Sequence, residues 1–231
     1  YDFNMDVLDA YLLRPVAVGY VEVTPVPVRN GIVNFTGNIT APVDMINAGL
    51  QGKPGNASVS LARFLVNSTV GLFGIFDVAS SLGLEIVDED FGQTLGHWGV
   101  GQGAYLVLPF IGPSTTRDAV GFVTDTLAFD PISYINNVRG RNQVRIMQFI
   151  DARTELLNAS SIIDEASLDP YAFQRDAYLQ YREALVQDKP SGDIDYSDSA
   201  DADYNYEAYT EEFNETISTE NSKTQKISQA E

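Results

Sequence analysis

The stretch from Asp90 to Asp118 constrains the fold more than any other part of the chain. The 26 residues from Phe91 to Thr116 carry no formal charge when His97 is neutral, which is enough to span a membrane. They nevertheless include six glycines and two prolines. In a helix interior, each glycine costs about 1 kcal/mol and each proline about 3 kcal/mol relative to alanine. The stretch is therefore predicted to be uncharged backbone folded tightly against lipid or protein, and not a simple transmembrane helix.

The net charge of −18 excludes several kinds of function. Nucleic-acid binding requires basic surface to neutralise phosphates, and adsorption to an anionic membrane by charge alone requires the same. The chain has no cysteine, which excludes disulfides, thiol catalysis and cysteine metal sites. With one histidine and no run of acids at calcium-loop spacing, the sequence predicts neither a metal nor a cofactor.

Charge and composition change sharply at Lys189-Pro190-Ser191-Gly192. From Asp188 to Glu231 there are twelve acidic residues, three lysines and few aliphatic residues, too few to offset the entropy lost on ordering. The sequence thus predicts a body over 1–189 and a disordered acidic tail over 190–231. Aromatic residues among the tail acids leave two interpretations open, a solvated spacer or a docking peptide that orders on a partner.

Helical spacing predominates in the body, whereas alternation of apolar and polar residues is scarce, so the sequence predicts helices and few strands. Proline and capping residues set the expected boundaries. The predicted helices are 5–20 with a break at Arg14-Pro15, 28–39, a short helix from Pro42, 57–70 capped by Asn56, 114–127, 141–158, and 170–187 capped by Asp169.

A second uncharged run extends from Phe64 to Phe76. Its thirteen residues are too short to cross a hydrocarbon core, which requires about 20. Because the run is apolar on all sides, it is either buried in protein or immersed in lipid at an interface. The candidates for membrane-embedded residues are Phe64, Leu65, Leu72, Phe73, Ile75 and Phe76.

The glycines of the first stretch do not form a nucleotide-binding motif. Gly99-x-Gly101-x-Gly103 lacks the lysine and helix of a P-loop and the spacing of a dinucleotide site. Two compatible explanations remain: close helix packing with tight turns, or a wall at which backbone comes close to a lipid.

The same stretch carries a family resemblance. Its matching residues are Phe91-Gly92-Gln93-Thr94-Leu95-Gly96, Trp98, Gly99, Gly103, Tyr105, Pro109, Gly112-Pro113-Ser114 and Arg117-Asp118. Upstream matches include Leu8-Asp9, Arg14-Pro15, Arg29-Asn30, Asn34-Phe35, Leu50-Gln51-Gly52 and Arg63-Phe64, and downstream ones are Asp169-Pro170-Tyr171 and Tyr178. In order and spacing these residues resemble the MlaA (VacJ) family of outer-membrane lipoproteins.

The resemblance implies an all-α fold, a ring- or doughnut-like assembly of short helices lying in the membrane plane. It implies a non-enzymatic channel in the inner leaflet of a bacterial outer membrane that removes mislocalised phospholipids from the outer leaflet. Its expected partners are phospholipid, a trimeric porin and a periplasmic lipid-shuttle protein. The lipid channel or packing candidates are Phe91, Gly92, Gln93, Thr94, Leu95, Gly96, Trp98, Gly99, Gly103 and Tyr105. The family's signal peptide and lipid-carrying cysteine precede the segment present here, so we expect a longer, lipid-anchored precursor.

Three further interpretations stay open. Arg139, Arg141 and Arg145 are either solvated surface or contacts to lipid phosphates or acidic partner groups, which the guanidinium fork suits. A lipase-like hydrolase using Ser114 and His97 is an alternative function, although no Gly-x-Ser-x-Gly elbow is present. A purely structural, porin-associated adaptor is the other alternative.

The acidic tail generates a prediction of its own. A chain ending at Lys189 should melt at the same temperature as the full chain, because the tail adds almost no core. It should bind the lipid shuttle more weakly, mostly at low ionic strength, because salt screens the attraction of the tail's charge to a basic patch. Equal affinities of the two chains at low and physiological salt would leave the tail as a solvated spacer.

Overall fold

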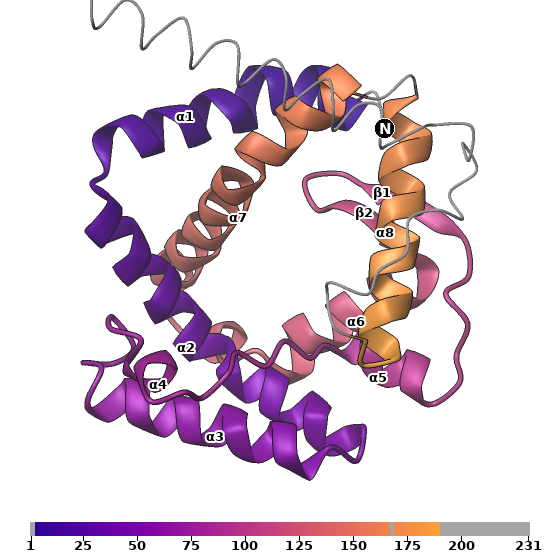
Figure 1. The fold of residues 1–231 in the computed structure, drawn as a ribbon. Helices are drawn as coiled ribbons and strands as arrows, with labels where there is room; N and C mark the ends of the chain where they lie inside the picture. Colours follow the sequence, from indigo (N-terminus) through magenta and orange to yellow (C-terminus); the bar gives the residue numbers. More distant parts are fainter. Residues whose placement is uncertain (1–2, 167–168, 190–231) are drawn as a thin grey trace, which may run out of the picture. The chain divides into compact units, whose positions relative to one another are not determined.

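The computed structural model describes residues 3–166 and 169–189. The chain divides into two units, Tyr1–Ile194 and Asp195–Glu231. The second unit, and with it the acidic tail predicted over 190–231, lies outside the described residues. The described part of the first unit is mainly helical with one small hairpin, which confirms the all-α prediction (Figure 1). The ring-like assembly stays a prediction.

The elements follow one another along the chain as shown in Figure 1. They are η1 (Phe3–Leu13), α1 (Arg14–Val23), α2 (Val26–Leu50), α3 (Pro54–Thr69), α4 (Val78–Ser81), α5 (Phe91–His97), β1 (Tyr105–Leu108), β2 (Gly112–Thr115), α6 (Thr116–Thr124), η2 (Asp125–Phe129), η3 (Pro131–Tyr134), α7 (Val138–Ala166) and α8 (Pro170–Val186).

The predicted break at Arg14-Pro15 is a change of helix type. The π-helix η1 passes directly into α1, with Pro15 in the first turn of the α-helix, where its missing N–H is not required. α1 then packs against α7.

The break predicted before Pro42 was wrong. α2 runs unbroken over 25 residues with Pro42 inside it. Proline removes one backbone hydrogen bond, but α2 packs along α3, and this packing holds both halves of the helix in line. Nearby, the Thr40 hydroxyl donates to the Thr36 carbonyl at 3.3 Å and the Gly37 carbonyl at 3.1 Å.

The predicted cap of α3 was also wrong. The helix begins at Pro54, whose fixed φ suits a first position, and Lys53 precedes it. Asn56 therefore lies inside the first turn. Its amide donates to Glu89 Oε1 at 3.1 Å and so connects α3 to the segment that leads into α5.

The glycine-rich stretch forms more regular structure than its composition predicts. Asp90 caps α5, its carboxylate accepting from the Gln93 N–H at 2.8 Å. Residues 105–115 form an antiparallel hairpin in which Tyr105 pairs with Thr115. The helix predicted from Ser114 begins at Thr116 instead, because Ser114 lies in β2 and Thr115 is the cap.

The last two long helices agree better with the sequence. α7 contains the predicted 141–158 helix and extends beyond it at both ends. α8 has the predicted first turn: Pro170 is at its start, and the Asp169 carboxylate accepts from the Ala172 N–H at 3.0 Å. α8 packs against α5, β2 and α7, so it brings the C-terminal part of the body to the glycine-rich stretch.

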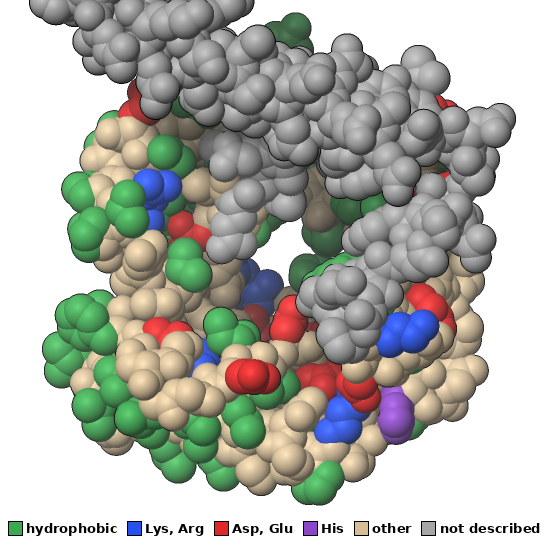
Figure 2. Space-filling model, in the orientation of Figure 1, with side chains coloured by type: hydrophobic (Ala, Val, Ile, Leu, Met, Phe, Trp, Pro, Cys, Tyr) green, Lys and Arg blue, Asp and Glu red, His purple; other side chains and the backbone are tan. Residues whose placement is uncertain are grey.

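Polar side chains dominate the interior of the described residues. The buried apolar side chains are four alanines and Ile132, whereas fifteen polar or charged side chains are buried. Many large apolar residues are exposed: Figure 2 shows hydrophobic side chains over the α3 side of the unit and charged ones over α5 and α8. A hydrogen-bonded polar network, and not an oil-like core, therefore connects the helices.

A single added methyl group at the crossing of α5 and α6 should destabilise the fold. A Cβ at Gly121 would lie 2.3 Å from the Gly92 nitrogen, which is backbone that cannot move aside. We expect Gly121→Ala to lower the free energy of unfolding by about 1–3 kcal/mol through overpacking. The measurement is urea denaturation. Gly37→Ala is the matched control, because Gly37 is also helical but meets no atom within 4 Å. That change should stabilise the chain by about 1 kcal/mol. Equal effects of the two substitutions would contradict the close crossing.

Candidate functional site

The centre of the candidate site is Arg182, a buried arginine of α8 that joins three helices. Its guanidinium donates twice to Asp90, from Nη1 to Oδ2 at 2.6 Å and from Nη2 to Oδ1 at 2.9 Å. It also donates to Asp118, from Nε to Oδ2 at 3.1 Å and from Nη2 to Oδ1 at 3.0 Å. This arrangement uses the planar fork for which arginine is suited, and it ties α8 to α5 and α6.

Neighbouring groups complete the pairing. The Tyr178 hydroxyl donates to Asp118 Oδ2 at 3.0 Å, and Arg117 Nε donates to Asp118 Oδ1 at 3.0 Å. Burial alone would raise the pKa values of Asp90 and Asp118, but Arg182 outweighs it and holds both below their usual range. Burial and the Asp118 carboxylate raise the pKa of Tyr178. At neutral pH the cluster therefore holds two carboxylates, the Arg182 cation between them, the Arg117 cation on Asp118, and a neutral phenol beside Asp118.

Glycine at position 92 follows directly from this cluster. A Cβ there would lie 2.7 Å from both Arg182 Nη2 and Asp118 Oδ1. Gly96, one turn later, leaves room for Val186, whose Cγ2 would be 2.6 Å from an added Cβ. Gly103 has φ +72° and lies against Thr116. These contacts support the close-packing explanation for three of the glycines, whereas Gly99 and Gly101 meet nothing within 4 Å.

The other predicted residues of this stretch lie around α5. Gln93 and Thr94 are buried, while Phe91, Leu95 and Tyr105 are half-buried. The Phe91 ring lies edge-on to Trp98, with centroids 5.9 Å apart. Trp98 is 54% exposed and donates from Nε1 to the Leu50 carbonyl at 3.1 Å. The structure thus brings most of these candidates together on one short helix and its continuation.

A second polar cluster lies beside the first, between α2, α3 and α5. Buried Glu89 accepts from Gln51 at 2.8 Å, from Lys53 at 3.1 Å and from Asn56. Asp125 accepts from Asn47 and from the Phe91 N–H, each at 2.8 Å. These bonds fix the position of the segment that enters α5.

The carboxylates near this second cluster are not all ionised at neutral pH. Removal from water and the nearby Asp88 carboxylate raise the pKa of Asp44 to about 8. Burial also raises the pKa of Asp125. Within residues 3–166 and 169–189, no group of three or more histidine, cysteine or acidic residues has the geometry of a metal site.

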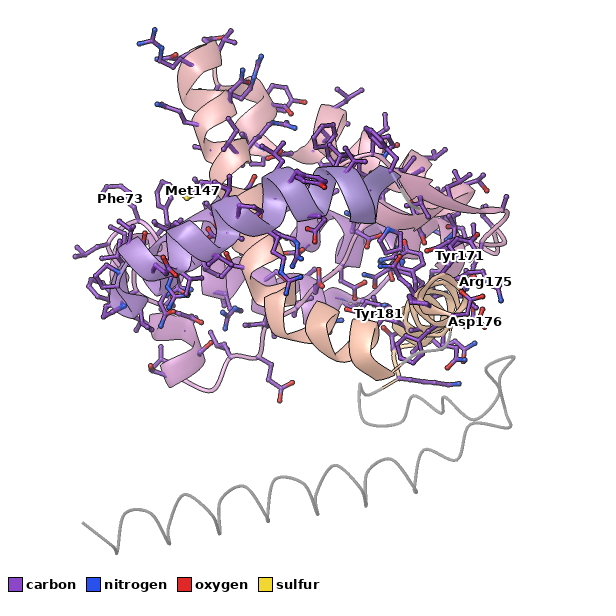
Figure 3. The ribbon with its side chains drawn as sticks, turned by 90° about the horizontal axis from the view of Figure 1, so that it is seen from above. Phe73, Met147, Tyr171, Arg175, Asp176 and Tyr181 are labelled. Atoms are coloured by element: carbon purple, nitrogen blue, oxygen red, sulfur yellow. The ribbon has the colours of Figure 1, made fainter. Side chains whose placement is uncertain are left out.

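Most of the predicted membrane-embedded residues are exposed. Phe73 is 76% exposed, and Leu65, Leu72, Ile75 and Phe76 are exposed as well, whereas Phe64 is half-buried. Leu72 and Phe73 have φ values of +52° and +60°, a conformation that costs about 1–3 kcal/mol per residue. Figure 3 shows Phe73 at the outer edge of the first unit.

Polar contacts hold this strained loop from its inner side. The Gly74 N–H donates to the Asn67 carbonyl at 2.8 Å, and the Phe76 N–H to the Gly71 carbonyl at 2.9 Å. A Cβ at Gly74 would lie 2.4 Å from Asn38 Cβ. The loop is therefore fixed in a shape that turns its apolar side chains outward. No helix in the described part of the chain is both long and apolar enough to cross a membrane.

The remaining candidates are spread more widely. Arg139 is exposed and Arg141 half-buried, whereas Arg145 donates to Ser133 at 2.7 Å and pairs with Asp130 at 3.4 Å. Ser114 is buried, and its hydroxyl donates to the Thr115 carbonyl, while His97 is exposed at the end of α5. No hydrogen bond joins Ser114 to His97 among the residues described.

Sequence reasoning missed the central role of Arg182. Its partners Asp90 and Asp118 were visible as the charged ends of the uncharged stretch. Their shared partner lies 64 residues beyond Asp118, on a helix whose sequence resembles an ordinary amphipathic surface helix. One sequence signal pointed to a buried cation: an acidic residue stands at each end of the uncharged segment.

Comparisons with known proteins identify relatives over most of the chain. The model of the family described as MlaA lipoprotein matches residues 1–185. The "Intermembrane phospholipid transport system lipoprotein MlaA" of Shigella flexneri is 36% identical over 213 residues, 88% of this chain and 84% of that protein. The protein of the same name from Escherichia coli is 36% identical over 214 residues, again 88% and 84%.

A solved structure is similar as well. It comes from work on the "Structural basis for maintenance of bacterial outer membrane lipid asymmetry". It is 39% identical, has a TM-score of 0.71 and covers 80% of this chain and 93% of the other.

Removing the central cation should destabilise the body. Arg182→Met leaves the Asp90 carboxylate without its cation and Asp118 with Arg117 alone. We expect a loss of about 3 kcal/mol, the low end for a broken buried pair because the Asp90 side chain is 35% exposed. Arg175→Met is the control on the same helix, because the ion pair of Arg175 within the described residues is with adjacent Asp176 and its side chain is half-exposed (Figure 3). It should change stability by less than about 0.5 kcal/mol.

The pH dependence of this loss has a definite sign. Because the folded-state pKa values of Asp90 and Asp118 are lowered, their contribution is present above an unfolded pKa of about 3.9 and is lost as pH falls through the folded values. The difference between wild type and Arg182→Met in urea denaturation should be full at pH 6 and shrink below about pH 4. A difference that is the same at pH 3 and pH 6 would contradict the paired carboxylates.

Proposed function

The chain belongs to the MlaA lipoprotein family, and we propose that it is a phospholipid transport component of a bacterial outer membrane. In this function it removes phospholipids from the outer leaflet through a channel and passes them to a periplasmic lipid shuttle, which maintains lipid asymmetry. Two relatives are named as intermembrane phospholipid transport lipoproteins, and the similar structure concerns outer-membrane lipid asymmetry. It is not an enzyme in this proposal.

The observation that carries the proposal is the distribution of polar and apolar side chains. Most of the fully buried side chains of the described residues are polar or charged, and many large apolar side chains are exposed. In water such a surface would favour aggregation, because large contiguous apolar patches are rare on soluble monomers. Around a lipid path the same distribution is favourable, since acyl chains cover the outside and polar groups remain available inside.

The rigid loop of Leu72 and Phe73 supports a position in one leaflet. Side chains that enter only the interfacial part of a bilayer need a depth of about 5–10 Å, which an exposed loop provides without a spanning helix. We propose that the body lies in the inner leaflet, beside a trimeric porin, and is attached by a lipid on the segment that precedes this sequence in the precursor.

The glycine-rich stretch is proposed as part of the channel wall. Phe91 to Gly96 form a helix held on its inner side by Arg182, and Trp98 and Gly99 continue it at the surface. Figure 2 also shows a hollow in the first unit that the described side chains do not fill. A polar-lined path allows a charged head group to pass without contact with hydrocarbon, where a buried charge costs several kcal/mol. Arg139 and Arg141 are proposed to contact head groups or an acidic partner.

A test of membrane insertion uses the strained loop. The double variant Leu72→Asp, Phe73→Asp should bind phospholipid vesicles at least tenfold more weakly in flotation, because two exposed apolar side chains are replaced by charges. Ser81→Asp is the control, since it adds a charge at an exposed polar position close to the same loop. Unchanged vesicle binding of the double variant would show that the loop does not insert into the membrane.

A second experiment separates transport from its rivals. Cells that lack their own family member and express the full-length precursor should regain low levels of surface-exposed phospholipid, and cells expressing the double variant should not. Lyso-phospholipid released by the purified chain, and abolished by Ser114→Ala, would instead support a hydrolase. Normal porin binding with no change in surface phospholipid would support a structural adaptor.

A further inference from the structure

A cavity of about 380 Å³ lies between the first helices and α7. Its volume is in the range of known small-molecule pockets. Its lining residues lie outside the glycine-rich stretch. Its apolar lining consists of Leu12, Leu13, Val16, Ile146, Phe149 and Ile150. Leu12, Val16 and Ile146 are 45–60% exposed, so the cavity opens to the surface through an apolar mouth.

Two arginines of α7 complete the lining, Arg145 and Arg153. They lie eight residues apart on one helix, which places their Cα atoms about 12 Å apart along its axis. Arg153 is nearly buried and forms an ion pair with Asp9 of η1, so it holds the two walls of the cavity together. Arg145 is 35% exposed, and its pair with Asp130 is long at 3.4 Å. A pair of this kind contributes little to stability, which leaves guanidinium donors of Arg145 available to an incoming anion.

The chemistry of the lining selects among possible occupants. No lining side chain is a hydrogen-bond acceptor, because arginine only donates and the other six are hydrocarbon. A peptide segment in the cavity would therefore leave its backbone N–H groups without partners, which is costly. A hydrocarbon chain has no such groups. An amphiphile with an apolar chain and an anionic group fits both the apolar lining and the cation at the rim.

We propose that this cavity binds one acyl chain of a phospholipid, with the lipid phosphate at Arg145. The proposal rests on the proposed function, since it names a holding site for the lipid that the body transports. It also gives Arg145 a specific role that Arg139 and Arg141 do not share, because only Arg145 of the three lines the cavity.

The hairpin is the part of the glycine-rich stretch that reaches this cavity. Phe110, at the tip between β1 and β2, has φ +67° and lies edge-on to Phe149, with ring centroids 6.5 Å apart. Asn4 of η1 also donates to the Leu108 carbonyl at 2.9 Å. A lipid held in the cavity would thus contact Phe149, and Phe149 in turn contacts the tip of the hairpin.

The test is photo-crosslinking of the purified full chain in vesicles of phosphatidylethanolamine and phosphatidylglycerol. A phosphatidylglycerol with a diazirine at the end of one acyl chain is the probe, and adducts are located by mass spectrometry. We expect adducts on Phe149, Ile150 or Leu13. Ile146→Trp, which fills the mouth from an exposed position, should reduce them at least fivefold while thermal unfolding stays unchanged. No adducts on lining residues would overturn the proposal.

The role of Arg145 is tested with a matched pair. Arg145→Gln should reduce the adducts at least threefold, whereas Arg139→Gln, an exposed position on the same helix, should not. Equal labelling of the two variants would overturn the contact between Arg145 and the phosphate. Labelling of the wild type by a free fatty acid probe as strongly as by the phospholipid would also overturn this contact, because the cavity would then bind hydrocarbon without selecting a head group. The surface-phospholipid experiment decides the proposed function separately, because it does not depend on where the probe reacts.

Discussion

The body depends on the cation of Arg182 placed between Asp90 and Asp118. These residues come from α8, α5 and the first turn of α6, so one guanidinium holds three helices that lie far apart in the sequence. A buried ion pair is weak support for stability when compared with apolar packing, but it demands one geometry. This geometry requires glycine at position 92, because a side chain there would occupy the place of the Arg182 guanidinium.

The buried polar groups and the exposed apolar side chains have one physical cause. A helix with apolar residues outward and polar residues inward must satisfy its polar groups within the protein, because lipid offers no hydrogen bonds. The Glu89 cluster and the Arg182 cluster do this for α2, α3 and α5. The strained loop at Leu72 and Phe73 is held by the same means, through Asn38 and Asn67.

Local chemistry made part of this fold predictable. The start of α8 followed from Asp169-Pro170, since a cap and a first-turn proline act within four residues. The unbroken α2 was missed because packing along α3 outweighs the penalty of Pro42, and α5 was missed because its stability comes from Arg182 and not from helix propensity. The cavity beside Arg145 could not be predicted, since it forms between segments about 130 residues apart in the sequence.

The shortness of α5 has a consequence for the time course of folding. A seven-residue helix that contains two glycines is not stable alone, because helix nucleation is costly. Its main support, Arg182, lies 92 residues beyond Asp90. During synthesis α5 therefore lacks this support until α8 has emerged. We expect the uncharged stretch to be the last part of the body to order, and to be the part that most requires protection by a chaperone before the chain reaches its membrane.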